Sequence, residues 1–442
     1  CRFTLRAGVR FQDSPCFPSG AGREMTADDV LFTFENMARQ WKQVPYYPLF
    51  GERIVGLDDL AKGHADSISG IVVIDAWRID FYLTKSYSTF IKMMASPAAM
   101  IIPKEAVEYY GNHFGTNPVG TGPFKLARWR PFTSLEFVRN DHYWQHERGD
   151  TLPYLDKITI DLTATSASVF SEFTAENCDL FQAQERISRQ LPGALLDSSQ
   201  YKMTTAPAGL TTRMFVFSFK NSSEIAANKK MRQAIAAIFH REREPASDSH
   251  FANQPANTLV PPAFWLHHQP DTLVNSATQN TVPGNGIPIR IVSNIKSHDV
   301  HLLEQSLTTL GLSFKTDIIK TGYFRSLITQ EWDICRVAFV PGFIDFEDYY
   351  SLFYSKSNSD VNLGGFRDAV YDSLLELAAV ERNSVERERL FISLENVIRD
   401  KCPVILISHS QPDIFFSSRR VHGLESVFIF PDLSRIWLDQ SL

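Results

Sequence analysis

The sequence contains no run of the roughly 18 to 20 apolar residues that a membrane-spanning helix needs, and it does not open with a charged-then-apolar leader. If the protein is exported, we expect its signal to have been removed already. It also has no excess of basic residues, because 44 Lys and Arg stand against 50 Asp and Glu, a net charge of −6. Without a positive field, binding to nucleic acid or to an anionic membrane is not expected.

Cysteine is scarce and irregularly spaced. The total is odd and no C-x-x-C pair occurs, so the sequence allows one disulfide but not a disulfide framework. The five cysteines are Cys1, Cys16, Cys178, Cys335 and Cys402.

Motifs of known catalytic chemistry are absent as well. There is no G-x-S-x-G elbow and no H-E-x-x-H pair. The glycine-containing segment 115–121 lacks the lysine of a phosphate loop, and Gly284 and Gly286 do not complete a dinucleotide fingerprint. The adjacent His267 and His268 have no spaced acid or cysteine to complete a metal set. We therefore expect no cofactor, no metal and no enzymatic activity.

Aromatic residues, in contrast, are abundant: 33 Phe, 14 Tyr and 7 Trp in 442 residues. A chain of this length is too long for one core and predicts two or three lobes. Most of the aromatic rings must be core, which leaves a minority to line a cavity.

The stretch from Asn117 to Trp144 combines a turn with two alternating strands. Gly120 and Gly122 flank Thr121, and a proline stands on either side of this group. Such glycines predict a backbone with positive φ that approaches another surface closely, as in a hinge or a turn that faces a ligand. The residues that follow have the period-two apolar pattern of half-buried strands.

Further along, strands and helices alternate, which predicts an α/β fold. Apolar residues fall at helical spacing in 229–239, and 370–379 and 385–399 are the clearest late helices. The segment 404–408 is expected to be the last buried strand before a polar tail, and the Pro/Gly/Asn-rich tract 269–286 is expected to be loop.

Several blocks of the chain resemble, in the same order, the extracellular solute-binding proteins of the peptide and nickel class, which feed ABC transporters. Five blocks in the right order carry more weight than any one of them. In MTADDVLFTFE, Thr26 is the expected N-cap, with Asp28 and Asp29 in the first helical turn. The blocks are FTLRAGVRF (3–11), MTADDVLFTFE (25–35), NPVGTGPFKLARWRPFTSLEFVRNDHYW (117–144), LPYLDKI (152–158) and KMRQAI (230–235).

This resemblance implies a type 2 periplasmic-binding-protein fold, in which two α/β lobes joined by two chain passages close over a ligand by hinge bending. The implied domains are an accessory subdomain of lobe I (1–115), the lobe I core (116–215), lobe II (216–425) and a C-terminal return to lobe I (426–442). A monomer is implied, which captures oligopeptides and docks on a membrane permease.

The resemblance also places a ligand site in the stretch 332–346, WDICRVAFVPGFIDF. Oligopeptide-binding members carry F-D-x-x-R-x-G-W-x-x-D-Y there, with the arginine facing the ligand's carboxylate and the aspartate holding its α-ammonium. Arg336 matches the arginine and Phe339 the tryptophan, but Gly342 stands where the aspartate should be. A buried ammonium without a counter-charge costs several kcal/mol, and Asp345 could substitute only if the loop is rebuilt.

Each of these residues also has a structural interpretation. Arg336 could pair with a neighbouring carboxylate, and Asp345, Glu347 and Asp348 by default form a solvated acidic loop. The aromatic side chains of the stretch could wall a cleft or belong to the core. The candidate ligand-binding set is Gly120, Thr121, Gly122, Arg336, Phe339, Gly342, Phe343, Asp345 and Phe346.

Alternatives to peptide capture remain open. The glycine at position 342 raises the odds of a metal chelate or another small solute, and a truncated or regulatory relative with weakened binding is a further alternative. Cys1 fits either a lipid-modified first residue or a truncation point, and truncation is favoured because a strand follows at once where a polar tether is usual. The resemblance implies a periplasmic or extracellular location, with or without a lipid anchor.

Overall fold

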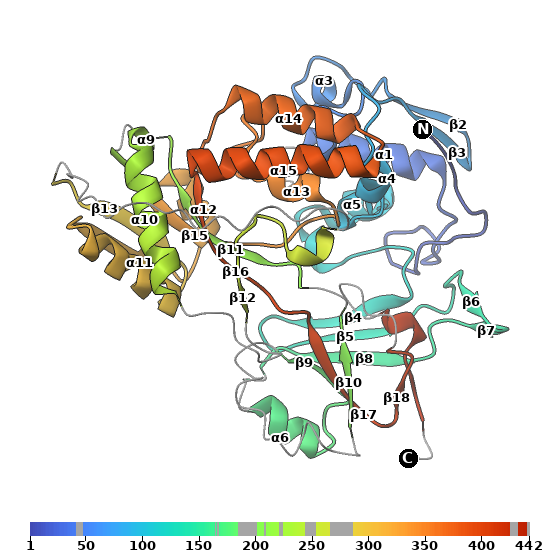
Figure 1. The fold of residues 1–442 in the computed structure, drawn as a ribbon. Coiled ribbons are helices and arrows are strands. Elements are labelled where there is room, and N and C mark those ends of the chain that lie inside the picture. Colours follow the sequence, from blue (N-terminus) through green and yellow to red (C-terminus); the bar gives the residue numbers. More distant parts are fainter. Residues whose placement is uncertain are drawn as a thin grey trace. The chain divides into compact units, whose positions relative to one another are not determined.

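The computed structural model describes residues 1–40, 47–163, 165, 168–183, 201–206, 209–220, 224–243, 253–265, 286–424 and 432–439. The chain divides into two compact units (Figure 1). Unit 1 comprises Cys1–Lys85, Pro97–Ala208 and Pro412–Leu442, and unit 2 comprises Ser86–Ser96 and Gly209–Gln411. The four-part division expected from the sequence stays a prediction. The expected loop at 269–286 lies almost entirely outside the described residues.

Unit 2 is built on a six-stranded mixed sheet with the order β12-β16-β11-β15-β13-β14. β13 runs parallel to β14 and β15, whereas β11 is antiparallel to β15 and β16. The strands are β11 (Thr212–Phe217), β12 (Gln254–Pro255), β13 (Ile289–Ser293), β14 (Phe314–Ile318), β15 (Ile334–Phe339) and β16 (Val404–His409).

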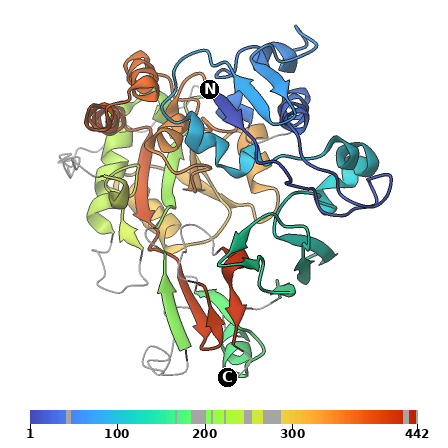
Figure 2. The same ribbon diagram turned by 90° about the vertical axis from the view of Figure 1, so that its right-hand side faces the viewer.

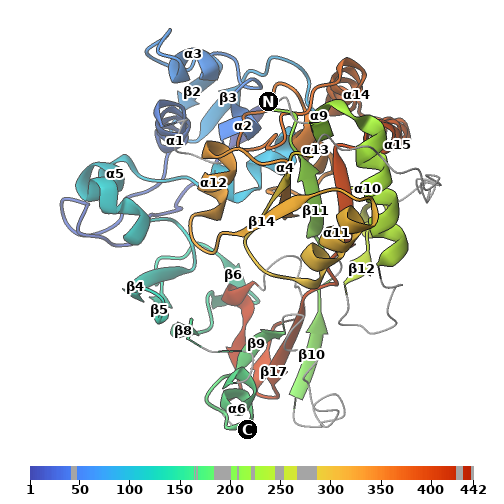
Figure 3. The ribbon, with the colours of Figure 1, turned by 90° about the vertical axis from the view of Figure 1, so that its left-hand side faces the viewer.

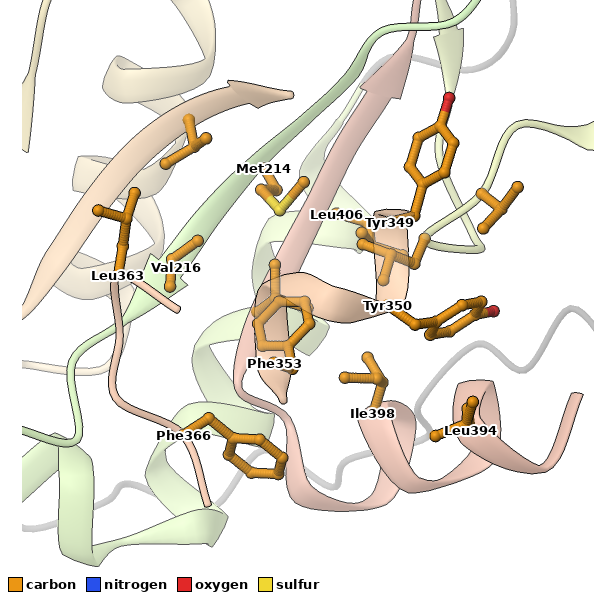
Figure 4. Close-up of a cluster of buried hydrophobic side chains, with 14 of the residues drawn as sticks. Met214, Val216, Tyr349, Tyr350, Phe353, Leu363, Phe366, Leu394, Ile398 and Leu406 are labelled. Atoms are coloured by element: carbon orange, nitrogen blue, oxygen red, sulfur yellow. The ribbon is translucent and has the colours of Figure 1, made fainter. Parts of the chain in front are cut away.

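The two faces of this sheet carry separate apolar cores because successive strand residues point to opposite sides. On β11, Met214 and Val216 belong to one core, whereas Phe215 and Phe217 belong to the other. Figure 4 shows the first core, where Met214 and Leu406 of the sheet lie near a group of aromatic rings that includes Tyr349 and Phe353. Burial on both faces explains the apolar runs 214–217 of β11 and 404–407 of β16.

Helices cover both faces of the unit 2 sheet. α10 (Lys229–Glu242) and α11 (His298–Thr309) lie side by side on the second core, as Figure 3 shows, and α14 (Ala369–Val380) packs along α15 (Ser384–Lys401) on the first (Figure 1). The helices expected at 229–239, 370–379 and 385–399 are thereby confirmed. Shorter helices are α4 (Phe90–Met94), α9 (Glu224–Ala227), α12 (Tyr323–Thr329), α13 (Phe346–Tyr350), η3 (Pro262–Phe264) and η4 (Ser351–Phe353).

Unit 1 begins with a small sheet, in which β1 (Arg2–Thr4) and β2 (Ile71–Asp75) flank β3 (Arg78–Phe81), and with α1 (Ala27–Arg39). Thr26 is the N-cap of α1 as predicted, and its backbone N–H donates to the Asp29 carboxylate at 2.9 Å. Other elements are α2 (Tyr47–Phe50), α3 (Leu57–Ala61), α5 (Lys104–Tyr110), η1 (Pro97–Ala99) and η2 (Gly111–Thr116).

Two further three-stranded sheets complete unit 1. β4 (Phe124–Arg130), β5 (Ser134–Arg139) and β8 (Lys157–Asp161) form an antiparallel sheet, and β4 and β5 are the two strands that the 117–144 stretch predicts. In the second, β17 (Ile414–Ser418) pairs with β9 (Leu180–Ala183) and β10 (Tyr201–Thr205), and Figure 2 shows the green β10 alongside the red β17. The remaining elements are α6 (Ser168–Thr174), β6 (His146–Glu147), β7 (Asp150–Thr151), β18 (Val421–His422), β19 (Trp437–Leu438) and η5 (Leu433–Arg435).

β17 corrects one prediction, because the chain does not become a polar tail after 404–408. Ile414, Phe415 and Phe416 are buried, and the Phe416 ring stacks on Phe181 of β9 with centroids 5.2 Å apart. β17 is the middle strand of its sheet, so its apolar side chains have partners that are remote in sequence and invisible to a local pattern.

The chain passes between the units more often than the expected two times. Besides the long passages near 208 and 411, the segment Ser86–Ser96 leaves unit 1 and belongs to unit 2. The backbone N–H of Ser88 donates to the carbonyl of Ala379 at 3.0 Å, and Lys92 reaches Asp345. All five cysteines are free, so the single disulfide that the sequence allows is absent.

Candidate functional site

Arg336 lies on β15 with its side chain almost wholly buried. Its Nε and Nη2 atoms donate to one carboxylate oxygen of Asp299, at 2.9 and 2.8 Å, and Asp299 belongs to the first turn of α11. No described residue accepts a hydrogen bond from Nη1 of Arg336. The structural pairing considered for Arg336 is thus present, and one side of its guanidinium remains available for a ligand carboxylate, a role that stays a prediction.

Asp345 is the centre of a buried ionic network. One oxygen accepts from Nη2 of Arg387 at 2.6 Å and from the backbone N–H of Glu347 at 3.0 Å; the other accepts from Lys92 at 2.6 Å and from Nη1 of Arg387 at 3.1 Å. Burial alone would raise the pKa of Asp345, but the hydrogen bonds and charges of Arg387 and Lys92 outweigh it and hold the pKa below its ordinary value.

Four donors occupy the acceptor sites of a carboxylate. In this conformation Asp345 therefore has no free position for a ligand ammonium, and its predicted ligand role requires the network to open. That role stays a prediction.

The expectation of a solvated acidic loop at Asp345, Glu347 and Asp348 is wrong, because all three residues are buried, with 2%, 2% and 7% exposure. They form the N-terminal turn of α13, where backbone N–H groups favour acidic side chains. Glu347 also accepts a hydrogen bond from the Thr89 hydroxyl at 2.8 Å.

Gly342 brings a second carboxylate into the site. Its backbone N–H donates to Oδ2 of Asp348 at 2.5 Å, although the two residues are six positions apart. The carboxylate of Asp348 therefore lies against the backbone of the residue at which the resemblance expects an aspartate. Sequence reasoning considered only Asp345 for this charge, since nothing in the spacing shows that the loop folds back onto the first turn of α13.

Phe339 and Phe346 pack against the first core of unit 2. Phe346 stacks on Phe391 with centroids 5.0 Å apart, and Phe339 meets Tyr349 edge to face at 5.3 Å. Phe343 is 4% exposed, whereas Phe339 and Phe346 are half-buried. Their core role is present in the structure, and the ligand role of all three stays a prediction.

The glycine turn lies in unit 1, before β4. The carbonyl of Gly120 accepts from the backbone N–H of Gln12 at 2.9 Å, and that of Gly122 accepts from the side-chain amide of Asn140 at 2.8 Å. Asn140 is fully buried, so it fixes the exit of β5 to the turn. Thr121 lies between the two anchored carbonyls, half-buried.

The expected positive φ at this turn is wrong. Neither Gly120 nor Gly122 has positive φ, and a Cβ atom added at either would meet no atom within 4 Å. The conformation and the packing of the turn therefore do not require glycine. The ligand role of Gly120, Thr121 and Gly122 stays a prediction, and the open space at both glycines is compatible with it.

Gly122→Ala is expected to leave the free energy of unfolding of unit 1 unchanged or raised by about 0.4–1 kcal/mol, because alanine restricts the unfolded chain without strain in the fold. The matched control is Gly423→Ala, where φ is +80° and the added Cβ would lie 2.0 Å from the Arg435 carbonyl oxygen. Urea unfolding should show a large loss only for the control. A loss at Gly122 as large as at Gly423 would contradict this account of the turn.

Sequence reasoning missed Lys92 and Arg387. A signal for Arg387 exists: residues 387, 391, 394 and 398 share one face of α15, and the other three are the buried Phe391, Leu394 and Ile398. An arginine on an apolar stripe predicts a buried acidic partner. Lys92 carries no such signal, because its segment lies far from 345 in the chain and joins unit 2 only in the fold.

Two general findings complete the site. Within the described part of the chain, no three His, Cys, Asp or Glu side chains are grouped as a metal ion would need. Among the helices of those same residues, none combines the length and apolarity required to cross a bilayer.

The relatives with similar sequences include periplasmic binding proteins. The probable ABC transporter periplasmic-binding protein SapA of Escherichia coli is 22% identical over 437 residues, which cover 92% of this chain and 76% of SapA. The dipeptide-binding protein of Pseudomonas aeruginosa is 22% identical over 467 residues, 96% of this chain and 80% of that protein.

Solved structures agree in fold. The periplasmic binding protein DppA from Helicobacter pylori, in complex with the peptide STSA, superposes with a TM-score of 0.78 at 18% identity and covers 99% of this chain and 86% of DppA. The dipeptide binding protein from Pseudoalteromonas sp. SM9913, in complex with Met-Leu, gives 0.75 at 21% identity, over 99% of this chain and 88% of that one.

The profile of one family matches residues 1–360, most of the chain, and includes both the glycine turn and the Arg336–Asp348 region. The chain therefore belongs to the bacterial extracellular solute-binding proteins, family 5.

Proposed function

We propose that this chain is the extracytoplasmic binding component of a peptide ABC transporter, which captures oligopeptides and delivers them to a membrane permease. The proposal places the chain in the periplasm or on the outer face of the cytoplasmic membrane, with or without a lipid on Cys1, and as a monomer. In this role the chain itself catalyses nothing, and other subunits hydrolyse ATP.

The observation that carries the proposal is the placement of opposite charges along β15 and the loop that follows it. Arg336 supplies a cation with an open Nη1 atom, and Asp348 supplies a carboxylate at the backbone of Gly342. A peptide has one charged group at each end, so a cation and an anion within one stretch of the chain suit its carboxylate and its ammonium. The names of relatives and of superposed structures, several of which bind peptides, support the same class of ligand.

Asp348→Asn tests this assignment. The substitution removes the charge next to Gly342, so it should weaken binding of a tripeptide with a free α-ammonium by roughly 10- to 100-fold and leave its N-acetylated form unaffected. Calorimetric titration of the full chain gives both affinities. Asp317→Asn is the control, because this carboxylate pairs with Arg290 on another part of unit 2. An unchanged ratio between free and acetylated peptide in Asp348→Asn would sink the assignment.

A second candidate function is capture of a metal chelate or another small solute within the same fold. The observation that favours it is Gly342, because the resemblance expects an aspartate at this position and glycine has no carboxylate. Asp348 restores a negative charge at this position, which is why we rank peptides first.

A further inference from the structure

Unit 2 contains a cavity of about 640 Å³ that is separate from the candidate site. It lies beyond the C-terminal end of β11. β11 and β15 are antiparallel, so the C-terminal end of β11 lies next to the start of β15 at Ile334. Phe339 is at the opposite end of β15, away from the cavity. We call it the serine pocket; its lining residues are Phe219, Lys220, Ser355, Ser357, Ser359, Asn362, Gly365 and Arg367.

Two cationic side chains line the serine pocket. Lys220 and Arg367 are exposed, and neither makes an ion pair with any residue that the structure describes. Behind the aromatic wall, Arg232 lies 4.8 Å from the Phe219 ring centroid and is bonded to backbone carbonyls rather than to a carboxylate. Asp360 is the carboxylate whose charge acts on Lys220, and the two form no ion pair.

Other charged groups of the same loop already have partners within the fold. Lys356 pairs with Glu376 at 2.7 Å, and Asp368 pairs with Lys401 at 3.1 Å. Asp372 accepts the hydroxyl and the backbone N–H of Ser355. Lys220 and Arg367 are therefore the two cations lining the cavity that form no ion pair with a described carboxylate.

The side chain of Lys220 packs against the backbone of the pocket wall. Gly365 has a φ of +68°, and a Cβ atom added to it would lie 2.8 Å from Cγ of Lys220, so the lysine stem lies against the glycine backbone. The adjacent Gly364 accepts a hydrogen bond from the backbone N–H of Phe219 at 2.6 Å. The buried Asn362 closes the loop through hydrogen bonds with Tyr354 and Phe366.

The pocket lining also contains side-chain hydrogen-bond donors. Ser357 donates to the Ser351 carbonyl, so its hydroxyl is engaged in the fold. Lys220, Arg367 and Ser359 have no hydrogen-bond acceptor for their side chains among the described residues. An ammonium, a guanidinium fork and a hydroxyl together are the donors that a phosphate group accepts. Burial also lowers the pKa of Lys220, a penalty that a bound anion would offset.

We propose that the serine pocket is a second binding site, which takes a small phosphorylated molecule whose phosphate is held by Lys220 and Arg367 and whose organic part lies against Phe219. The cavity has room for more than a phosphate group, because its volume falls in the range of small-molecule sites. This site is independent of peptide capture.

The test uses the full chain, with inorganic phosphate and glycerol 3-phosphate as probes in calorimetric titrations at constant ionic strength. Both probes should bind saturably, glycerol 3-phosphate more tightly, and Lys220→Met and Arg367→Gln should each weaken binding at least tenfold. Lys315→Met and Arg389→Gln, which change the same charges on exposed positions elsewhere in unit 2, should leave it unchanged.

Absence of saturable binding of both probes, or equal affinity in wild type and in the two pocket variants, would overturn the proposal. Equal loss in the control variants would show a general charge effect and overturn it as well. Binding of inorganic phosphate with no gain for glycerol 3-phosphate would refute the organic part of the ligand. Because both pocket residues are exposed, we expect the variants to fold, and unchanged peptide affinity verifies this separately.

Discussion

Asp345→Asn is expected to lower the free energy of unfolding of unit 2 by about 3 kcal/mol. The substitution removes the carboxylate that accepts two hydrogen bonds from Arg387, and the buried guanidinium then keeps the longer ion pair with Glu347, 3.6 Å away. Removing one partner of a buried ion pair costs about 3–5 kcal/mol, and the lower end applies because Lys92 is half exposed and can be solvated. Urea unfolding of the unit 2 transition measures the loss.

The matched control for Asp345→Asn is Glu386→Gln on α15, whose ion pair with Arg389 is exposed on both sides. Exposed pairs contribute about 0–1 kcal/mol, so the control should change little. In a double-mutant cycle with Arg387→Gln, the two losses should be strongly non-additive. Additive losses, or equal losses in Asp345→Asn and the control, would show that the network contributes no more than a surface pair.

The same network predicts an acid sensitivity. The pKa of Asp345 in the folded state is below its ordinary value, so its stabilisation is fully present above the unfolded pKa, about 4, and is lost as the pH falls through the folded pKa. The wild type should therefore lose more stability than Asp345→Asn as the pH drops below about 4. Parallel pH profiles for the two proteins would contradict the assignment of this network.

Arg336→Met is expected to weaken binding of a tripeptide with a free carboxylate by roughly 10- to 100-fold, because hydrogen bonds to a charged partner contribute about 1.5–3 kcal/mol. A C-terminally amidated tripeptide should lose little, so the ratio of the two affinities should fall toward one. Calorimetric titration provides both values.

Asp299→Asn separates the ligand role of Arg336 from its structural role. This control removes the carboxylate that pairs with Arg336 but keeps the guanidinium, so it should lower stability without reducing affinity for the free-carboxylate peptide. If Arg336→Met retains the wild-type preference for the free carboxylate, Arg336 serves only to bind Asp299.

Much of unit 2 could be predicted from local patterns, because helices such as 229–239 and strands such as 404–408 carry their own periodicity. Thr26 could also be placed, since an N-cap is specified by its immediate neighbours. The strand β17 could not, because Phe416 is buried by Phe181, more than 200 positions earlier, and strand pairing over such distances leaves no local mark.

The sequence predicted which segment contains the candidate site, residues 332–346, but not the contacts that its side chains make. Sequence comparison drew attention to Arg336 and to the missing carboxylate at Gly342. It could not show that Asp348 returns to Gly342, or that Lys92 and Arg387 enclose Asp345, because these contacts depend on the loop's conformation and on a segment inserted from the other unit. At Gly122, composition suggested positive φ, whereas the observed turn does not need it.

The proposed function requires that the chain bind peptides. Calorimetric titration of the purified chain with a defined tripeptide mixture, and in parallel with nickel chelates, tests it most directly. The account predicts saturable heat with a stoichiometry of one for the peptides and none for the chelates. Heat with the chelates alone would contradict it and establish the second candidate function instead.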